Sequence, residues 1–342
     1  MTAALRWGIL GAAHIAARRV LPAIARSRRH AVLAVASRDP SRARDFGQRF
    51  GIGRVYDRYE ALLADSEIDA VYNPLPNALH REWTERAARA GKHVLCEKPL
   101  AVNAADAAAM VAACAENGVV LQEAFMYRHH PQITRLRSLL RDGAIGEPWL
   151  VRAWFSFTTG PGNIRLDPAL GGGGLLDVGC YAVSLSRLLL GEPVSATADA
   201  AYENGVDVRL SSLLTFAGGR AALIDCGLRA PLRQGCEIVG VEGAIVLRRP
   251  FQPEEEPAAL LLTTSHGTTT VETPATNQYT LMMDDFAAAV LDGAPPAFPP
   301  SDAIANMRAL DAVALAARER ARRPIAPPAS GDEPPATVRS PS

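Results

Sequence analysis

The feature that most constrains the fold is a regular alternation of short apolar segments and helical segments in the first third of the chain. The predicted strands cover residues 5–10, 31–36, 68–72, 93–96 and 119–123. Helical patterns fill the intervals, and two of them end at Gly91 and Gly118, because glycine is favoured just after a helix. A repeated strand–helix unit folds as a parallel sheet with helices on both faces. The sequence therefore predicts a doubly wound α/β domain over residues 1–124.

The pattern changes near Glu147, where long segments of alternating apolar and polar residues replace the strand–helix units. These segments cover residues 149–157, 194–202, 206–216, 220–228, 236–241 and 244–247. They predict a second α/β domain, residues 125–323, with a large, open, mainly antiparallel sheet. Two late helices, 279–291 and 301–322, are compatible with a return to the first domain. Residues 324–342 are rich in proline, serine and charge and are predicted to be disordered.

Composition argues against several classes of protein. The chain has 342 residues, enough for two domains, and its 36 basic residues balance 36 acidic ones. This balance argues against a nucleic acid or an anionic membrane as partner. The five cysteines are odd in number and lack CxxC spacing, which is typical of free thiols in a reducing compartment. With no leader pattern and no stretch of about 18 apolar residues, we expect a cytoplasmic protein without a membrane span. His129 and His130 lack further ligands at suitable spacing, so no metal site is predicted.

The turn after the first predicted strand contains closely spaced small residues. Gly11, Ala13 and Ala16 occupy the three key positions of the pattern G-x-G-x-x-G/A, between a predicted strand and a predicted helix. Such a turn lets a pyrophosphate reach the amino end of the helix, where backbone N–H groups point outward. The pattern indicates a Rossmann dinucleotide site, although an ordinary small-residue turn would look similar.

The end of the second predicted strand bears on the choice of cofactor. NAD sites usually have an acidic residue here, which accepts hydrogen bonds from the ribose hydroxyls. This chain has Ser37 and Arg38 instead, and Asp39 is placed to cap the next helix. A hydroxyl and a guanidinium group suit the 2′-phosphate of NADP. The sequence therefore favours NADP over NAD, unless Arg38 is merely a solvated side chain.

Lys98 follows the fourth predicted strand, within Glu97-Lys98-Pro99, and so lies at the carboxyl edge of the sheet. Open α/β sheets bind their ligands at this edge. A lysine there could hold a substrate hydroxyl beside a nicotinamide ring, and the alternative is a surface lysine at a strand–loop junction. The run 73–80 follows another strand at the same edge, and its His80 could face the ring or simply pack.

Asp177 and Tyr181 are four residues apart in a predicted helix and so share one of its faces. The preceding glycines, residues 171–174, would allow close approach of a ligand or of another backbone segment. A tyrosine acts as a base near neutral pH only if its pKa, about 10, falls by roughly three units, which requires about 4 kcal/mol. A cation about 4 Å away at an effective dielectric constant near 20 supplies roughly that much, and Lys98 is the candidate. The alternative is a core-facing pair with Tyr181 as packing.

These segments together resemble the Gfo/Idh/MocA oxidoreductase family, which includes glucose–fructose oxidoreductase and inositol dehydrogenase. The resemblance rests on the Gly11 turn, Leu75-Pro76-Asn77-Ala78-Leu79-His80, the run 91–99 and the run 172–181. It covers residues 5–323 and implies a Rossmann domain followed by an α/β domain whose open sheet is often used for oligomerisation. It also implies that Lys98 is the catalytic lysine, that Tyr181 transfers the proton, and that Asp177 lies at the substrate site.

Within the family, the runs 122–131 and 163–168 are most similar to NADP-dependent D-xylose 1-dehydrogenases and trans-dihydrodiol dehydrogenases. Ketoreductases of nucleotide-linked deoxysugars are also similar. By this resemblance Arg128 and Arg165 join Asp177 as substrate-binding residues. The expected cofactor-binding residues are Gly11, Ala12, Ala13, His14, Ile15, Ser37, Arg38, Leu75, Asn77, His80, Glu97 and Lys98.

The sequence thus predicts an NADP-dependent dehydrogenase acting on CH–OH groups. It would transfer hydride between nicotinamide and a sugar (an aldose) or a related cyclic polyol, and NAD is also compatible. Two alternatives stay open, a reductase of a nucleotide-linked ketosugar and a non-catalytic NADP-binding protein. The uncovered face of the second sheet predicts a homodimer or homotetramer.

Overall fold

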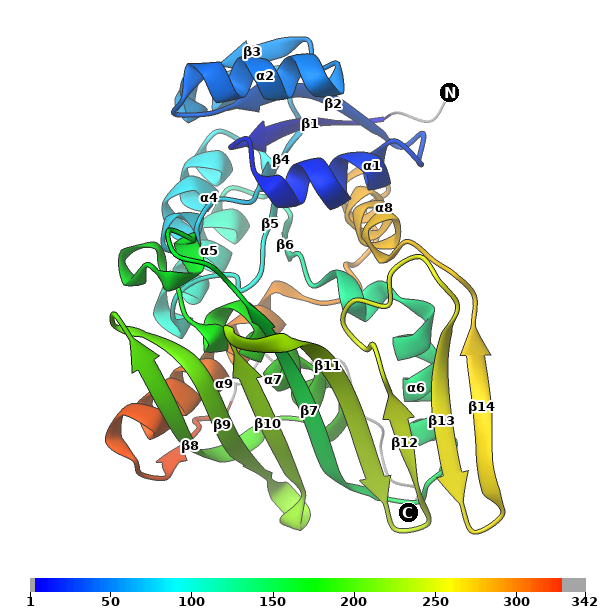
Figure 1. Ribbon diagram of the computed structural model, residues 1–342. Coiled ribbons are helices and arrows are strands. Elements are labelled where there is room, and N and C mark those ends of the chain that lie inside the picture. The colour runs from blue at the N-terminus through cyan, green and yellow to red at the C-terminus, as the bar shows by residue number, and fades with distance from the viewer. Residues whose placement is uncertain (1–3, 328–342) are drawn as a thin grey trace. The chain divides into compact units, whose positions relative to one another are not determined.

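The computed structural model describes residues 4–327, which form two compact units with one sheet each (Figure 1). Unit 1 comprises residues 4–126 and 277–303, and unit 2 comprises residues 127–276 and 304–327. The predicted fold class is confirmed, since one sheet is parallel and doubly wound and the other is open and mainly antiparallel.

Unit 1 contains six parallel strands in the order β3-β2-β1-β4-β5-β6. The strands are β1 Leu5–Leu10, β2 His30–Ala36, β3 Arg54–Tyr56, β4 Ala70–Asn73, β5 His93–Cys96 and β6 Leu121–Glu123. The strand order reverses between β1 and β4, which lie side by side at the centre. In such sheets ligands bind outside the carboxyl ends of the strands at the point of reversal.

Helical segments of unit 1 connect these strands. They are η1 Ala16–Val20, α1 Leu21–Ile24, α2 Pro40–Phe50, α3 Tyr59–Leu63, η2 Asn77–Leu79, α4 His80–Arg89 and α5 Ala104–Glu116. Asp39 caps α2 as expected, because its carboxylate accepts from the backbone N–H groups of Ser41 and Arg42. The first helical turns after Gly11 include the π-helical segment η1.

Helix α8, Gln278–Leu291, comes from the late part of the chain and packs against α1 and β1 of unit 1. Its Asp284 accepts from the hydroxyl of Ser27 at 2.7 Å and lies 3.1 Å from Nε2 of His30. Nδ1 of His30 accepts from the indole N–H of Trp7, so Nε2 is the protonated nitrogen that donates to Asp284. The late helix is therefore joined to β2 and to the loop before it by partly buried polar bonds, and through His30 to Trp7 of β1.

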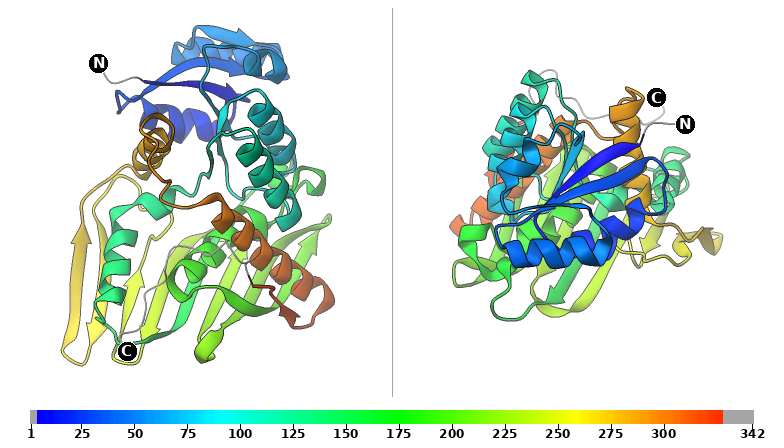
Figure 2. Two further views of the ribbon diagram at one scale, coloured as in Figure 1. Left: turned by 180° about the vertical axis from the view of Figure 1, so that it is seen from behind. Right: turned by 90° about the horizontal axis from the view of Figure 1, so that it is seen from above.

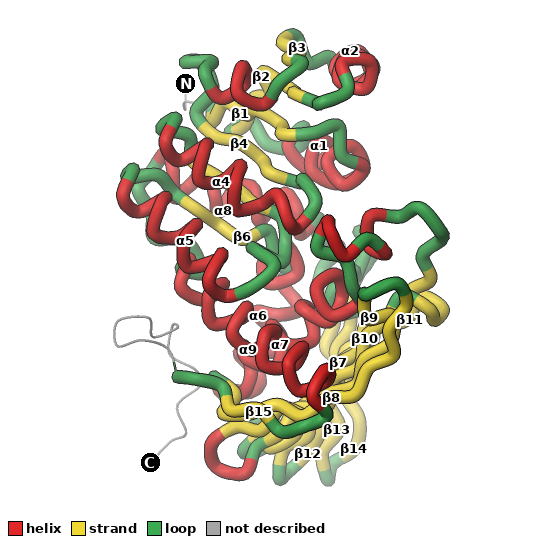
Figure 3. The backbone as a smooth tube through the Cα atoms, turned by 90° about the vertical axis from the view of Figure 1, so that its left-hand side faces the viewer, coloured by secondary structure: helices red, strands yellow, loops and turns green. Residues whose placement is uncertain are grey.

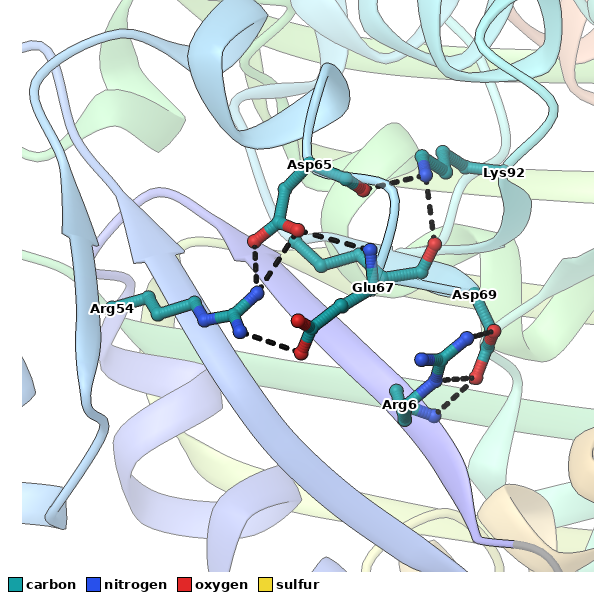
Figure 4. Close-up of polar contacts among 7 residues, drawn as sticks. Arg6, Arg54, Asp65, Glu67, Asp69 and Lys92 are labelled. Carbon is teal, nitrogen blue, oxygen red and sulfur yellow. Dashed lines mark hydrogen bonds and ion pairs between the residues drawn. The ribbon is translucent and has the colours of Figure 1, made fainter.

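A polar network lies where β3 and α3 meet the chain entering β4 (Figure 4). The guanidinium group of Arg54 donates to Asp65 and Glu67, and the hydroxyl of Tyr56 also donates to Asp65. Burial alone would raise the pKa of Asp65, but these bonds and the Glu67 N–H outweigh it and lower the pKa to about 2. The network fixes the chain between α3 and β4.

Unit 2 contains nine strands in the order β14-β13-β12-β11-β7-β10-β9-β8-β15. The strands are β7 Pro148–Thr158, β8 Pro193–Glu203, β9 Val206–Phe216, β10 Ala221–Gly227, β11 Arg229–Gly240, β12 Gly243–Leu247, β13 Ala258–Thr264, β14 Gly267–Thr273 and β15 Arg323–Pro324. Neighbouring strands are antiparallel except β7 and β10, which pair in parallel.

Helices cover one face of this sheet (Figures 2 and 3). They are α6 Pro131–Arg141, α7 Cys180–Leu190 and α9 Pro300–Glu319, of which residues from 304 on belong to unit 2. Shorter helical segments are η3 Met126–His129, η4 Ile164–Leu166, η5 Pro168–Leu170, η6 Leu175–Gly179 and η7 Ala217–Gly219. Phe155 of β7 points to α7 and is buried, so the core of unit 2 lies between the sheet and the helices.

The opposite face of the unit 2 sheet has exposed side chains in register across four strands. Leu213 pairs with Leu223, Leu223 with Arg152, and Arg152 with Glu237, so these residues form one row. Leu213 is 36% exposed and Leu223 44%. A groove of about 520 Å³ crosses this face and includes Trp154. The predicted uncovered face is thus present within unit 2.

One expectation about the end of the chain needs correction, whereas the apolar helix of unit 2 does not contradict the expected lack of a membrane span. The helical stretch Pro168–Leu190 is long and apolar enough to cross a membrane by length and composition, but 83% of its most apolar window is buried in the fold. Disorder was predicted from residue 324, yet Pro324 pairs with Ser195 and the N–H of Ile325 donates to Val194. The rest of the predicted tail, residues 328–342, lies outside the described residues.

Candidate active site

The glycine turn in unit 1 has the geometry that its sequence predicts. Gly11 follows β1 with φ +94°, where any other residue would be strained, and a Cβ would lie 3.1 Å from the side chain of Leu75. Its N–H donates to the carbonyl of Ala36 at 2.7 Å, which fixes the turn between β1 and β2. Ala16 is fully buried, whereas His14 at the helix start is exposed. The amino end of this helix can therefore receive a pyrophosphate.

The end of β2 provides donors for a further phosphate. Ser37 accepts from the N–H of Asp39, and the exposed Arg38 interacts with the hydroxyl of Tyr59. Arg42, from the first turn of α2, donates to the carbonyl of Ala12 in the glycine turn at 3.3 Å. Two guanidinium groups and a hydroxyl beside a helix amino end fit a 2′-phosphate. Arg42 is a candidate that no motif in the sequence indicates, because it lies on the first turn of α2 and not at the strand end with Ser37 and Arg38.

The segment after β5 holds Lys98 through its neighbour Glu97. One carboxylate oxygen of Glu97 accepts from the hydroxyl of Tyr72 at 2.6 Å, and the other accepts from the N–H of Lys98 at 3.2 Å. The N–H of Glu97 donates to the carbonyl of Asn73, at the end of β4. Lys98 is half-buried at the carboxyl edge of the sheet. Glu97 therefore fixes the backbone that presents Lys98.

His80 links two loops of unit 1. Its ring is fully buried, with Nε2 2.8 Å from the carbonyl oxygen of Leu75 and Nδ1 3.0 Å from that of Pro99. Burial lowers the pKa of His80, so the neutral ring donates to one of these two oxygens. Both ring nitrogens are thus directed at the backbone. This contact ties the loop after β4, which contains Asn77, to the segment after Lys98, and gives His80 a structural part in the predicted cofactor site.

In unit 2, Tyr181 lies in the first turn of α7, inside a group of aromatic rings. It is 3% exposed, and its ring centroid lies 5.8 Å from Tyr127, 5.5 Å from Phe155 and 5.3 Å from Phe251. Asp177 precedes it by four residues, in the π-helical segment η6 that leads into α7. The aromatic group fixes the tyrosine ring by packing on several sides.

Two of the predicted substrate residues are paired with each other. Nε of Arg165 donates to a carboxylate oxygen of Asp177 at 2.6 Å, and the Asp177 side chain is 13% exposed. A Cβ on Gly172 would lie 2.5 Å from the carbonyl oxygen of Arg165, so a glycine is needed where the loop folds back. Of the two expected reasons for the glycine run, a ligand or another backbone segment, the structure shows close approach of the backbone at Arg165.

Arg128, also predicted to bind substrate, is 6% exposed and contacts α7. Its guanidinium group donates twice to the hydroxyl of Ser184, at 3.1 Å and 2.8 Å, and that hydroxyl lies 2.6 Å from the hydroxyl of Tyr127. Ser184 is three residues after Tyr181 on the same helix. Arg128 therefore joins the start of unit 2 to the helix of Tyr181, a link that only the structure reveals.

The predicted site residues thus fall into two groups. Unit 1 brings together Gly11, Leu75, His80 and the Lys98 segment, and unit 2 brings together Asp177, Tyr181, Arg165 and Arg128. The approach of Lys98 to Tyr181 stays a prediction. Among residues 4–327, no group of three or more His, Cys, Asp and Glu side chains is placed to hold a metal ion.

Two protein-family models match the chain. The model described as "Oxidoreductase family, NAD-binding Rossmann fold" matches residues 5–125, and the model described as "GFO/IDH/MocA C-terminal domain" matches residues 133–246. The chain belongs to the Gfo/Idh/MocA oxidoreductase family. The predicted family and the predicted oxidoreductase class are confirmed, and unit 1 contains the family's dinucleotide-binding domain.

Characterised relatives of this Gfo/Idh/MocA protein cover nearly its whole length. "D-xylose 1-dehydrogenase (NADP(+)) 2" of Haloferax volcanii is 40% identical over 314 residues, which cover 90% of this chain and 96% of the relative. A dTDP-3,4-didehydro-2,6-dideoxy-alpha-D-glucose 3-reductase of Actinomadura kijaniata is 38% identical and covers 92% of this chain and 96% of its own.

Solved structures of Gfo/Idh/MocA proteins match the fold closely. A 3-ketoreductase from Actinomadura kijaniata in complex with NADP and TDP-benzene has a TM-score of 0.88 at 36% identity, covering 92% of this chain and 98% of that one. An aldose–aldose oxidoreductase from Caulobacter crescentus complexed with glycerol has a TM-score of 0.87 at 30% identity, covering 94% and 99%.

Proposed function

We propose that this protein is an NADP-dependent dehydrogenase that oxidises a hydroxyl-bearing carbon of an aldose or a related cyclic polyol. The observation that supports it most is the arrangement at the start of α7, where Asp177 lies four residues before Tyr181 and three aromatic rings fix the tyrosine. A relative that is 40% identical over 90% of the chain is an NADP-dependent D-xylose 1-dehydrogenase, which points to the same substrate class.

In this proposal each residue has a distinct part. Tyr181 accepts the hydroxyl proton of the substrate, and the ammonium group of Lys98 favours the phenolate form of the tyrosine by its charge. Asp177, with Arg165 beside it, holds neighbouring hydroxyls of the substrate by hydrogen bonds. Glu97 and His80 position the loops that present Lys98.

The cofactor proposed is NADP, which when bound accepts hydride from the substrate carbon. The Gly11 turn and the helix that begins at His14 would hold its pyrophosphate, with Ala12, Ala13 and Ile15 contributing backbone. Ser37, Arg38 and Arg42 would hold its 2′-phosphate. Both the D-xylose dehydrogenase and the 3-ketoreductase relatives are described with NADP, which supports this choice.

Reduction of a nucleotide-linked ketosugar is the second candidate function. Four relatives between 37% and 41% identical are dTDP-ketosugar 3-reductases. The same proton path would serve in reverse, since Tyr181 as phenol would then donate a proton to the forming alkoxide. A dTDP group would need additional contacts, so the two functions differ in substrate size and charge.

We also propose that the protein forms a homodimer or homotetramer through the exposed face of the unit 2 sheet. Leu213 and Leu223 are exposed side by side there, and the charges next to them pair within the chain, as in the ion pair of Arg152 with Glu237. A face of this kind suits contact with a second copy. A cytoplasmic location is proposed because all five cysteines are buried free thiols.

The deciding experiment follows NADPH absorbance with the purified protein. D-xylose, other aldoses and a trans-dihydrodiol are offered with NADP, and a dTDP-linked 3-ketosugar is offered with NADPH. Turnover of an aldose or cyclic polyol supports the first proposal, and turnover of the ketosugar alone supports the second. Tight NADP binding without turnover of any of these substrates would favour a non-catalytic NADP-binding protein.

A further inference from the structure

One carboxylate of unit 2 that lies outside the predicted site contacts the start of the Tyr181 helix. Asp207, near the start of β9, accepts from the N–H of Leu175 at 2.6 Å and from the N–H of Gly174. Leu175 is the first residue of η6, which continues directly into α7. The carboxylate of a sheet residue therefore binds the N–H groups at the start of a helical segment that runs from 175 to 190.

The fit between Asp207 and the glycine run is tight. A Cβ on Gly173 would collide with one carboxylate oxygen of Asp207, and a Cβ on Gly174 would lie 3.2 Å from the other. Gly173 also has φ +125°, which other residues rarely adopt. Gly173 is thus required by the approach of Asp207, and Gly174 leaves little room for a side chain, so the carboxylate packs directly against the glycine turn.

This contact is chemically favourable because a helix start presents unpaired N–H groups and a partial positive charge. Asp177 is two residues after Leu175, and Tyr181 is six residues after it, which is less than two helical turns. A shift of Leu175 would therefore move both side chains, since few residues separate them from the anchor.

The groups facing Asp207 come from three other elements. Arg318 of α9 attracts its charge, Tyr202 of β8 bonds to Arg318, and Cys226 of β10 lies close enough to interact with it. Burial raises the pKa of Asp207 to about 6, although the N–H bonds and Arg318 oppose that rise. The pKa values of Tyr202 and Cys226 are raised further above neutrality, and an arginine stays charged, so Asp207 is the group of this set that titrates near pH 6.

We propose that Asp207 is a positioning residue whose ionised carboxylate anchors the first turn of the helix that contains Asp177 and Tyr181, and so holds these side chains in their working positions. The anchoring stands on the contacts of Asp207 alone, whereas its effect on turnover rests on the proposed function. Protonation of Asp207 weakens the anchor, because a neutral carboxyl group accepts less strongly than a carboxylate.

Amide hydrogen exchange of the purified protein tests the anchor without any assay of activity. Asp207→Asn keeps the side-chain size but replaces one acceptor oxygen by an NH2 group. Exchange of the amides of residues 173–177 should then become about tenfold to a hundredfold faster, as expected for loss of a charge-assisted bond. Residues 183–188 of the same helix should keep their rates. The control is Asp199→Asn on β8, whose side chain is 79% exposed, and it should change neither segment.

Unchanged exchange at residues 173–177 in Asp207→Asn would overturn the anchor. If this variant does not fold, the pH dependence of amide exchange in the wild-type protein tests the anchor instead. Its protection of 173–177 relative to 183–188 should fall as the pH falls through about 6. A ratio that stays constant between pH about 8 and about 5 would contradict the proposal.

The effect on turnover is measured with NADP and D-xylose, or with the substrate that turns over in its place. Asp207→Asn should lower kcat on the order of tenfold to a hundredfold, leave the Kd for NADP unchanged, and remove the fall in kcat that the wild type shows below pH about 6. If exchange at residues 173–177 is faster in Asp207→Asn but kcat equals that of the wild type, the anchor does not position the reacting side chains. This result would overturn the proposed effect of Asp207 on turnover. If no substrate turns over in the wild type, the proposed function fails, and the exchange experiment still decides on the anchor.

Discussion

Arg165 donates to the carboxylate of Asp177 at 2.6 Å, so two residues expected to bind substrate separately are bound to each other. Both residues lie in unit 2, and Asp177 precedes Tyr181 by four residues. A substrate hydroxyl at this place would therefore meet a carboxylate that Arg165 already orients and whose charge Arg165 already balances. A neutral polyol suits such a pair better than an anion, which would compete with Asp177 for the guanidinium group.

Replacing Arg165 by Gln should therefore weaken binding of a neutral sugar, because Asp177 loses the partner that orients it. A charge-assisted hydrogen bond contributes about 1.5–3 kcal/mol, so KM should rise roughly tenfold to a hundredfold, with a smaller change in kcat. Initial rates over a range of sugar concentrations measure both constants. The control is Arg320→Gln, whose side chain is 82% exposed. A wild-type KM in Arg165→Gln would show that the pair is structural.

Replacing Tyr181 by Phe removes the ionisable oxygen but keeps the ring in its aromatic surroundings. Loss of general acid–base catalysis typically lowers the rate by about 10²–10⁴-fold, so kcat should fall by that range while the Kd for NADP stays the same. Lys98→Met should also slow turnover, and the two effects should not add fully, because residues that act as one unit are non-additive. A folded Tyr181→Phe enzyme with wild-type kcat would contradict the role of the tyrosine.

Replacing Arg38 or Arg42 by Ala should discriminate between the cofactors. Each guanidinium group is expected to bind the 2′-phosphate by charge-assisted bonds, so each variant should lose roughly tenfold to a hundredfold in NADP affinity and little in NAD affinity. Fluorescence titration with both cofactors measures this. Arg89→Ala, with a side chain 63% exposed on α4, is the matched control. Equal losses for NADP and NAD would argue against a 2′-phosphate site.

The Asp65 network predicts how stability depends on pH. The pKa of Asp65 is about 2 in the folded protein and 3.8 in its unfolded reference, so the carboxylate stabilises the fold above pH about 4. This contribution is lost as the pH falls through the folded pKa. Asp65→Asn should therefore unfold at a lower temperature than wild type at neutral pH, and the difference should shrink towards pH about 2. Thermal unfolding followed by circular dichroism checks this, with the exposed Asp57→Asn as control.

The exposed row on the unit 2 sheet predicts how assembly can be disrupted. Leu223→Glu places a charge in the centre of the proposed interface and should convert the oligomer to monomers at micromolar concentration. Light scattering after size-exclusion chromatography measures the mass. Leu281→Glu is the control, because Leu281 is similarly exposed at 37% but lies on α8 of unit 1. A monomeric wild-type protein would contradict the proposed interface.

The sequence predicted best what depends on local pattern. The turn at Gly11, the cap at Asp39 and the position of Lys98 at a strand end follow from short runs of residues whose geometry is set by their neighbours. The sequence also predicted that the first sheet is parallel and the second mainly antiparallel, because hydrophobic periodicity distinguishes buried parallel strands from half-exposed antiparallel ones.

What the sequence could not predict depends on contacts between distant segments. Asp207 meets the glycine run across 32 residues of chain, and Arg128 meets Ser184 across 56. No local pattern distinguishes these residues from ordinary strand or loop residues. The glycine run by itself is compatible with a ligand or with another backbone segment, and the structure explains it by Asp207 and by the backbone around Arg165. Such pairs become visible only when the fold brings them together.

The return of α8 to unit 1 sets an order in which the protein can be completed during synthesis. Residues 5–126 leave the ribosome before α8 does, so Trp7 at first lacks Phe286, whose ring lies 5.2 Å away in the finished fold. His30 lacks Asp284 as well. Both partners are made only after every strand of the unit 2 sheet except β15. Because domains begin to fold as they emerge, the nucleotide-binding unit lacks helix α8 while the strands of unit 2 are being synthesised. A fragment that ends near residue 126 would therefore keep an uncovered apolar surface beside β1.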